Sequence, residues 1–186
     1  AGNDAAGSRD NKVAVLPFSV VRDGQNTADE VGVRVQNDCY VLLTKHAGEL
    51  SIQDPRTTNA QLFKAGVTKE NVKGYTMEDL CKILGVEYVL EGMVTLNQTT
   101  QTSTTTNTYK ASDSKDNKSG DKDKKKASGT TFATSSINYE TNVSLNIYND
   151  KGNSVFSQMR KSFWNDQDAY KATLEYLLKR SPVYRK

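Results

Sequence analysis

The stretch LGVEYVLEGMV, Leu84–Val94, decides the expected fold of this chain. It joins an apolar-periodic segment over 77–84 directly to a run of β-branched and aromatic residues. Glycine readily adopts the left-handed conformation that ends helices, so Gly85 predicts a helix end. A strand is then expected to start one residue later, at Val86. A helix that returns so directly to a strand is typical of a sheet whose strands are joined by helices.

The two faces of this predicted strand differ in chemistry. One face is apolar throughout and carries Val86, Tyr88, Leu90, Gly92, Val94 and Leu96, while the other mixes Val89 and Met93 with Glu87 and Glu91. Apolar residues on both faces predict a central strand. We expect Glu87 at the solvated start of the strand. We expect Glu91 either where no helix covers the sheet or paired with a cross-strand Lys or Arg. A catalytic role for Glu91 is the alternative, but no second acid is placed with it.

The segments on either side predict the remaining elements from hydrophobic period, capping residues and turns. In the first half of the chain we expect a strand over 12–21 with Pro17 at the strand end, a capping box at Thr27–Glu30 opening a helix to about His46, a strand over 50–54, and a helix over 57–65 with Leu62 and Phe63 inward. After a capping box at Thr76–Asp79 we expect a hairpin of 137–147 with 154–164 around Gly152, and a last helix burying Tyr170, Leu174, Leu177 and Leu178. This order predicts an α/β fold: a mixed sheet of about five strands, three of them parallel plus an antiparallel hairpin, with helices mainly on one face.

One internal segment differs in composition from the rest. Residues 99–129 contain only Tyr109, Ala111 and Ala127 as apolar side chains, whereas the remainder of the chain is about 40% apolar, an ordinary globular value. Thr-rich residues 97–109 favour β structure and are interpreted as one arm of a water-exposed hairpin. Residues 110–129 cannot contribute to a core. We therefore expect a flexible tether over 1–11 and a single α/β domain over 12–182 with a polar insertion at 99–129.

The insertion also holds the excess positive charge. Between its first and last lysine it contains seven Lys and four Asp, which equals the net charge of +3 of the whole chain. A neutral body with one basic loop argues against a nucleic-acid surface, because no aromatic residues alternate with the lysines. A possible interaction loop for an acidic partner or an anionic membrane surface is Lys110, Lys115, Lys118, Lys122, Lys124, Lys125 and Lys126.

The two cysteines and the single histidine offer little chemistry. Cys39 and Cys81 each fall on the apolar stripe of a predicted helix, which favours buried free thiols; one disulfide between the helices is the alternative. His46, near a helix end, is expected to be structural. The chain contains no Gly-rich phosphate loop, no G-x-S-x-G and no H-E-x-x-H motif. The expected protein is not an enzyme and needs no cofactor; an unrecognised enzyme and a nucleic-acid-binding domain using the Lys-rich loop are the alternatives.

The opening AGNDAAGSRDNK is small and polar and lacks an initial Met, which is typical of a mature N-terminus and a tether. No run of 18 apolar residues is present, so no membrane-spanning helix is expected.

Three segments together resemble a known group of proteins. They are the strand VAVLPF (13–18), the helix and strand ending in LGVEYVLEG (84–92), and the hairpin SLNIYNDKGNSVFS (144–157). The chain resembles the amino-terminal domain of TolB, the curli-secretion subunit CsgG and the outer-membrane lipoprotein activators of penicillin-binding proteins. It departs from them in its long insertion, in the NDK turn before Gly152 and in lacking the membrane-inserting hairpins of the curli subunit.

This resemblance implies a bacterial, exported domain in the periplasm or anchored to the outer membrane. It implies work by protein–protein contact in envelope assembly or secretion, with an envelope protein as partner. It supplies no catalytic residues to assign.

Overall fold

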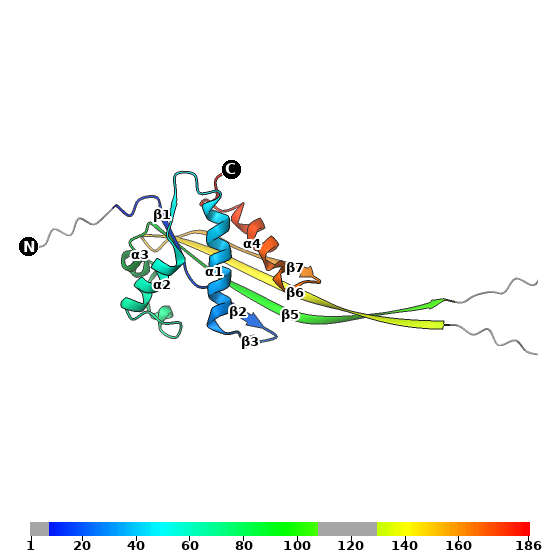
Figure 1. The fold of residues 1–186 in the computed structure, drawn as a ribbon. Coiled ribbons are helices and arrows are strands. Elements are labelled where there is room, and N and C mark those ends of the chain that lie inside the picture. Colours follow the sequence, from blue (N-terminus) through cyan, green and yellow to red (C-terminus); the bar gives the residue numbers. More distant parts are fainter. Residues whose placement is uncertain (1–7, 108–129) are drawn as a thin grey trace, which may run out of the picture.

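The computed structural model describes residues 8–107 and 130–186 (Figure 1). The helices are α1 (Asp29–Thr44), α2 (Pro55–Lys64), α3 (Met77–Leu84) and α4 (Tyr170–Leu178), with short 3₁₀ turns η1 (Val72–Gly74) and η2 (Gln167–Ala169). The strands are β1 (Lys12–Val15), β2 (Ser19–Arg22), β3 (Gln25–Asn26), β4 (Ser51–Ile52), β5 (Tyr88–Asn107), β6 (Thr130–Asn149) and β7 (Ser154–Trp164).

Strand β5 is the centre of one mixed sheet. On one side it runs parallel to β1 and β2, with Val13 opposite Tyr88 and Val20 opposite Val94. On the other side it pairs antiparallel with β6, which pairs antiparallel with β7. Strand β4 lies parallel to β1 at one edge, and β3 extends β2 by an antiparallel turn. The expected α/β class and mixed sheet are therefore confirmed.

The predicted strand over 12–21 is divided into β1 and β2 at Leu16–Phe18. Pro17 has no N–H to donate to the ladder, which is why the break falls there. The backbone N–H of Leu16 still reaches the Leu90 carbonyl at 2.9 Å, and the Phe18 N–H donates to the Gly32 carbonyl at 3.2 Å. The break therefore turns Phe18 toward α1 while both half-strands stay beside β5.

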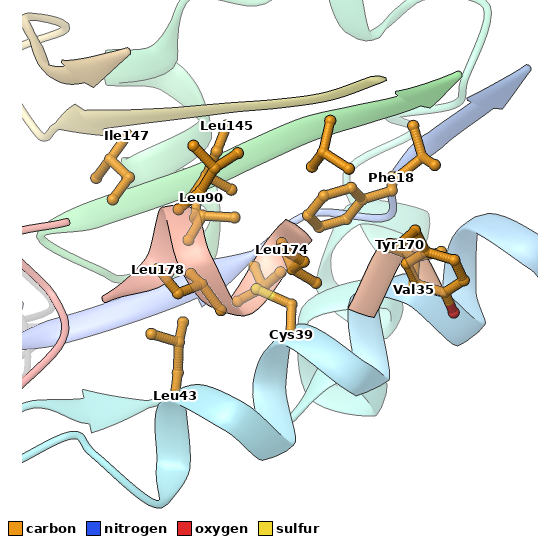
Figure 2. Close-up of a cluster of buried hydrophobic side chains, with 14 of the residues drawn as sticks. Phe18, Val35, Cys39, Leu43, Leu90, Leu145, Ile147, Tyr170, Leu174 and Leu178 are labelled. Carbon is orange, nitrogen blue, oxygen red and sulfur yellow. The ribbon is translucent and has the colours of Figure 1, made fainter. Parts of the chain in front are cut away.

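The buried side chains of the described residues form one cluster on each face of the sheet. Helices α1 and α4 cover the first face, where Val35, Cys39 and Leu174 pack on Leu90 and its neighbours in β6 (Figure 2). Helices α2 and α3 cover the second face, but only beside β1, the start of β5 and the end of β6. The expectation of helices mainly on one face thus holds for α1 and α4 and is wrong for α2 and α3. Alternate residues of β1 explain this, because Val13 and Val15 face one cluster and Ala14 the other.

The helix ends follow the predicted capping at one of two sites. Thr76 and Asp79 form the predicted capping box of α3, and Gly85 ends that helix with φ +66°. The box predicted at Thr27 is wrong, because α1 starts after Ala28 without a side-chain cap. The Thr27 hydroxyl instead donates to the Val20 carbonyl at 3.0 Å, which closes the turn between β2 and α1.

Candidate interaction surface

The outer parts of β5 and β6 form a two-stranded ribbon that projects from the fold. Strand β2 accompanies β5 only as far as Leu96, and β7 accompanies β6 only to Tyr139. Beyond them, Thr100–Asn107 pairs with Thr130–Ile137, and no third described strand joins this pair, which we call the ribbon. At about 3.3 Å per residue it extends about 25 Å beyond the sheet, and Figure 1 shows it projecting away from the helices.

The ribbon lacks a packing face. Its described side chains are mostly Thr and Ser, and its large apolar side chains, Phe132 and Ile137, are 59% and 49% exposed. Besides the backbone ladder, a 3.4 Å hydrogen bond joins the Ser103 hydroxyl to the Thr134 carbonyl. A two-stranded hairpin without a third strand or a packed face is marginally stable in water. The ribbon therefore offers two edges and two uncovered faces to a partner.

The predicted interaction loop lies outside the described residues. The chain leaves the ribbon at Asn107 and re-enters it at Thr130. All seven lysines of that loop, from Lys110 to Lys126, fall in this interval. The prediction that the Thr-rich tract forms one arm of an exposed hairpin is confirmed up to Asn107.

A second uncovered area lies on the sheet face where α2 and α3 end. Met93, Met159 and Phe163 project there from β5 and β7 and are all exposed. Beside them is a groove of about 450 Å³ between the β1–β2 break and α2, lined by Leu16, Leu62, Phe63, Val67, Val72 and Glu91 among others. Phe63 was predicted to point inward, but it is 84% exposed and Leu62 alone is buried. The face and the groove together make a mixed apolar and polar surface.

Glu91 lies on this face, at the border of the area that the helices cover. Burial raises the pKa of its carboxyl, and hydrogen bonds from Tyr148 and Asn146 partly offset this effect. In the described residues its neighbours are these two polar side chains of β6, and no Lys or Arg lies within ion-pair distance of it. The predicted cross-strand ion pair is therefore not found among the described residues, and Glu91 lies at the edge of the helix cover, in the groove beside α2.

The other residues considered for chemistry are the two cysteines and His46, and all three are packed as parts of the fold. Cys39 belongs to the cluster under α1 and Cys81 to the cluster under α3, on opposite faces of the sheet, and both are free and buried. Burial raises the pKa of both thiols, that of Cys81 to about 11. Such thiols are poor nucleophiles at neutral pH. His46 stacks on Tyr184 with ring centroids 4.4 Å apart.

Neither a metal-binding cluster nor a membrane-spanning helix occurs in the described part of the chain. Over 8–107 and 130–186, no group of three or more His, Cys, Asp or Glu is arranged to hold a metal ion. Among the helices in these ranges, none is both long and apolar enough to cross a membrane.

Comparison with known proteins gives a structural likeness. No family model matches the chain, and no curated protein matches it. Among solved structures it is similar to lipoprotein GNA1162 from Neisseria meningitidis, with 12% sequence identity and a TM-score of 0.49. The alignment covers 91% of this chain and 93% of that one. A likeness at this level leaves activity, partner and location to be argued from the chain itself.

Proposed function

We propose that this chain is a non-enzymatic domain of the bacterial cell envelope that works by protein–protein contact in envelope assembly or secretion, and that the ribbon is its contact element. The observation that carries the proposal is a ribbon with two edges that no described strand pairs and no packed face. Unpaired strand edges bind other chains by adding a strand to the sheet. A polar ribbon of this length offers a partner strand edges to pair with, and it contributes little to the stability of the domain because it has no packed face.

The sequence resemblance supports the envelope part of this proposal. The strand VAVLPF, the junction at Gly85 and the hairpin around Gly152 occur together in exported envelope proteins that have no catalytic site to transfer. The location we propose is the periplasm or an outer-membrane anchor.

The test compares two deletions in the producing bacterium. In the first, an Asn-Gly turn replaces 100–137 and joins Thr99 to Asn138, which removes the ribbon with a turn suited to two-residue hairpins. In the second, only 110–129 is removed and the ribbon stays. Size-exclusion chromatography of gently solubilised envelopes reports whether the chain travels in a larger assembly. Thermal melting of the purified chains reports the fold.

We expect the wild-type chain in the envelope fraction and in an assembly larger than the monomer. Without the ribbon, the chain should elute as a free monomer with its melting temperature little changed. The variant that lacks only 110–129 should keep the assembly. A chain without the ribbon that still travels in the assembly, or a wild-type chain found in the cytoplasm, would contradict the proposal.

A further inference from the structure

Two arginines enclose one tyrosine ring where α4 lies beside β7. The Cζ atoms of Arg160, from β7, and of Arg180, just after α4, both lie 3.5 Å from the centroid of the Tyr176 ring. Two planar guanidinium groups reach this distance together only from opposite faces of the ring. Their cationic carbons are therefore no more than about 7 Å apart. We call this arrangement the arginine clamp.

The clamp holds two like charges close together without a counter-charge. Among the described residues, no carboxylate lies within 4.0 Å of either guanidinium. Arg180 Nη1 donates to the Tyr176 carbonyl at 3.2 Å, which fixes its position and uses one of its five N–H groups. Both arginine side chains are exposed, and Tyr176 is partly buried against the core. Most of the donors of the clamp are thus oriented by stacking and are accessible.

The surrounding segment adds positive charge. Residues 154–186 contain seven basic and three acidic side chains, and two of the basic ones, Lys161 and Lys171, pair with Glu140 and Asp38 of other elements, which leaves a local excess of two positive charges. The acids are already engaged: Asp168 faces Arg34 at 3.7 Å, Glu175 holds Lys179 at 2.9 Å, and Asp166 accepts from the Asp168 N–H. The local field therefore favours an anion at the clamp.

We propose that the arginine clamp is a binding site for a phosphate or diphosphate group, carried either by a free phosphorylated ligand or by a lipid headgroup. A carboxylate is satisfied by one guanidinium fork, whereas phosphoryl groups present three or more oxygens and accept from two forks at once. An anion at the edge of the Tyr176 ring, within reach of the N–H groups of both arginines, also offsets the repulsion between the two cations. The side of the domain involved is formed by α4 and β7 and does not include the ribbon.

The test titrates the full chain with inorganic pyrophosphate at low salt and follows the amide signals of β7 and α4 by NMR. We expect Arg160→Gln and Arg180→Gln each to weaken binding about tenfold, because each removes one charge-assisted fork. Lys161→Gln and Lys179→Gln, which remove the same charge nearby from ion-paired side chains, should weaken it by less than about twofold. Tyr176→Phe should bind like the wild type and Tyr176→Leu clearly more weakly, although both arginines remain.

A second arm separates the two sources of phosphate. Vesicles of phosphatidylglycerol and of phosphatidylcholine are sedimented with the wild type and with the Arg160→Gln, Arg180→Gln double variant. Both proteins contain residues 110–129, so any binding to vesicles through the lysines of that segment is the same in both. A loss of vesicle binding in the double variant assigns a lipid headgroup, and a loss confined to pyrophosphate assigns a free ligand.

The proposal is overturned if the wild type binds neither probe, or if the double variant binds both probes like the wild type. It is overturned equally if the two lysine variants lose as much affinity as the arginine variants, since bulk charge would then explain binding. A glutamate-rich peptide that displaces pyrophosphate at equal or lower concentration would replace the phosphate assignment by an acidic protein partner. Circular dichroism and melting curves confirm that every variant is folded.

Discussion

Gly92 lies against the ring of Phe18, where β5 passes the break between β1 and β2. A Cβ atom built on Gly92 would overlap with Phe18 Cε1 and stand 2.7 Å from the Ser144 carbonyl oxygen. The other side of Phe18 is closed by α1, because a Cβ on Gly32 would overlap with the Phe18 carbonyl oxygen. One aromatic residue thus joins the break, the central strand and the longest helix.

We therefore expect Gly92→Ala to destabilise the domain by about 1–3 kcal/mol, since the added methyl group must displace a ring and a strand backbone. Urea unfolding monitored by circular dichroism measures the loss. Gly74→Ala is the matched control, because a Cβ atom added there would meet nothing within 4 Å and its φ is ordinary. Adding Phe18→Leu to Gly92→Ala should restore part of the stability, as expected of residues in contact. Equal effects at Gly92 and Gly74 would contradict this interpretation.

Adjacent residues Leu62 and Phe63 should differ sharply on truncation. Leu62 is buried under α2 while Phe63 is 84% exposed at the groove. We expect Leu62→Ala to lower the free energy of unfolding by about 2–3 kcal/mol. Phe63→Ala should change it by less than about 0.5 kcal/mol. The same urea titration tests the pair, and a large loss at Phe63 would mean that its ring is covered in solution.

The wrong prediction for Phe63 shows that hydrophobic periodicity does not decide which of two adjacent apolar residues is buried. Helix α2 is short and contacts β1 and α3 through one narrow stripe, which Pro55, Thr58 and Leu62 fill. Two adjacent apolar residues lie about 100° apart on a helix, so a narrow stripe admits only one of them. Periodicity alone left that choice open. At Gly85, in contrast, the local rule and the tertiary structure agree, and helix end and strand start were both predicted.

The candidate surface was predicted only in part. The Thr-rich arms follow from β propensity and the lack of apolar residues, and the ribbon extends their ladder to Asn107. The helices on the second face were missed, because the side on which a helix packs depends on its connections and hardly on its own period. The arginine clamp joins Arg160 to residues 176 and 180 across a loop and a helix, and no local spacing marks such a pair.

The two thiols should be unlinked, unreactive in the folded state and a source of instability at high pH. Cys39 and Cys81 lie on opposite faces of the sheet, so thiol titration after unfolding without reductant should count both, and a count of zero would refute this. The folded pKa of each thiol is above its unfolded value, so their contribution to stability is complete below about pH 8.5 and declines above it. Urea midpoints measured from neutral pH to about pH 10 should fall, and less steeply in Cys81→Ala.

Glu91→Gln should make the domain modestly more stable at neutral pH. The pKa of this carboxyl is raised by burial, so ionising it in the folded state is unfavourable compared with the unfolded chain. The resulting loss of stability begins as pH rises through the unfolded value of about 4.3 and is complete above the folded pKa. The amide oxygen of Gln can still accept from Tyr148 and Asn146. Melting temperatures of both proteins should converge below about pH 4, and envelope association should be unchanged. Loss of association with intact folding would instead indicate a catalytic or contact role for Glu91.

Removing 110–129 should leave the domain folded, because the only apolar side chains of that segment are Ala111 and Ala127. Loop-closure entropy changes by only about 0.6 kcal/mol per doubling of loop length, so the melting temperature should hardly change. The open question is attachment, since each basic residue near an anionic lipid surface is worth about 1 kcal/mol. Four Asp among the seven Lys weaken this attraction, and we expect intact and excised chains to bind phosphatidylglycerol vesicles alike at low salt. If the intact chain binds better, and its advantage fades as screening shortens to about 8 Å at physiological salt, the seven lysines between 110 and 126 are a contact element themselves.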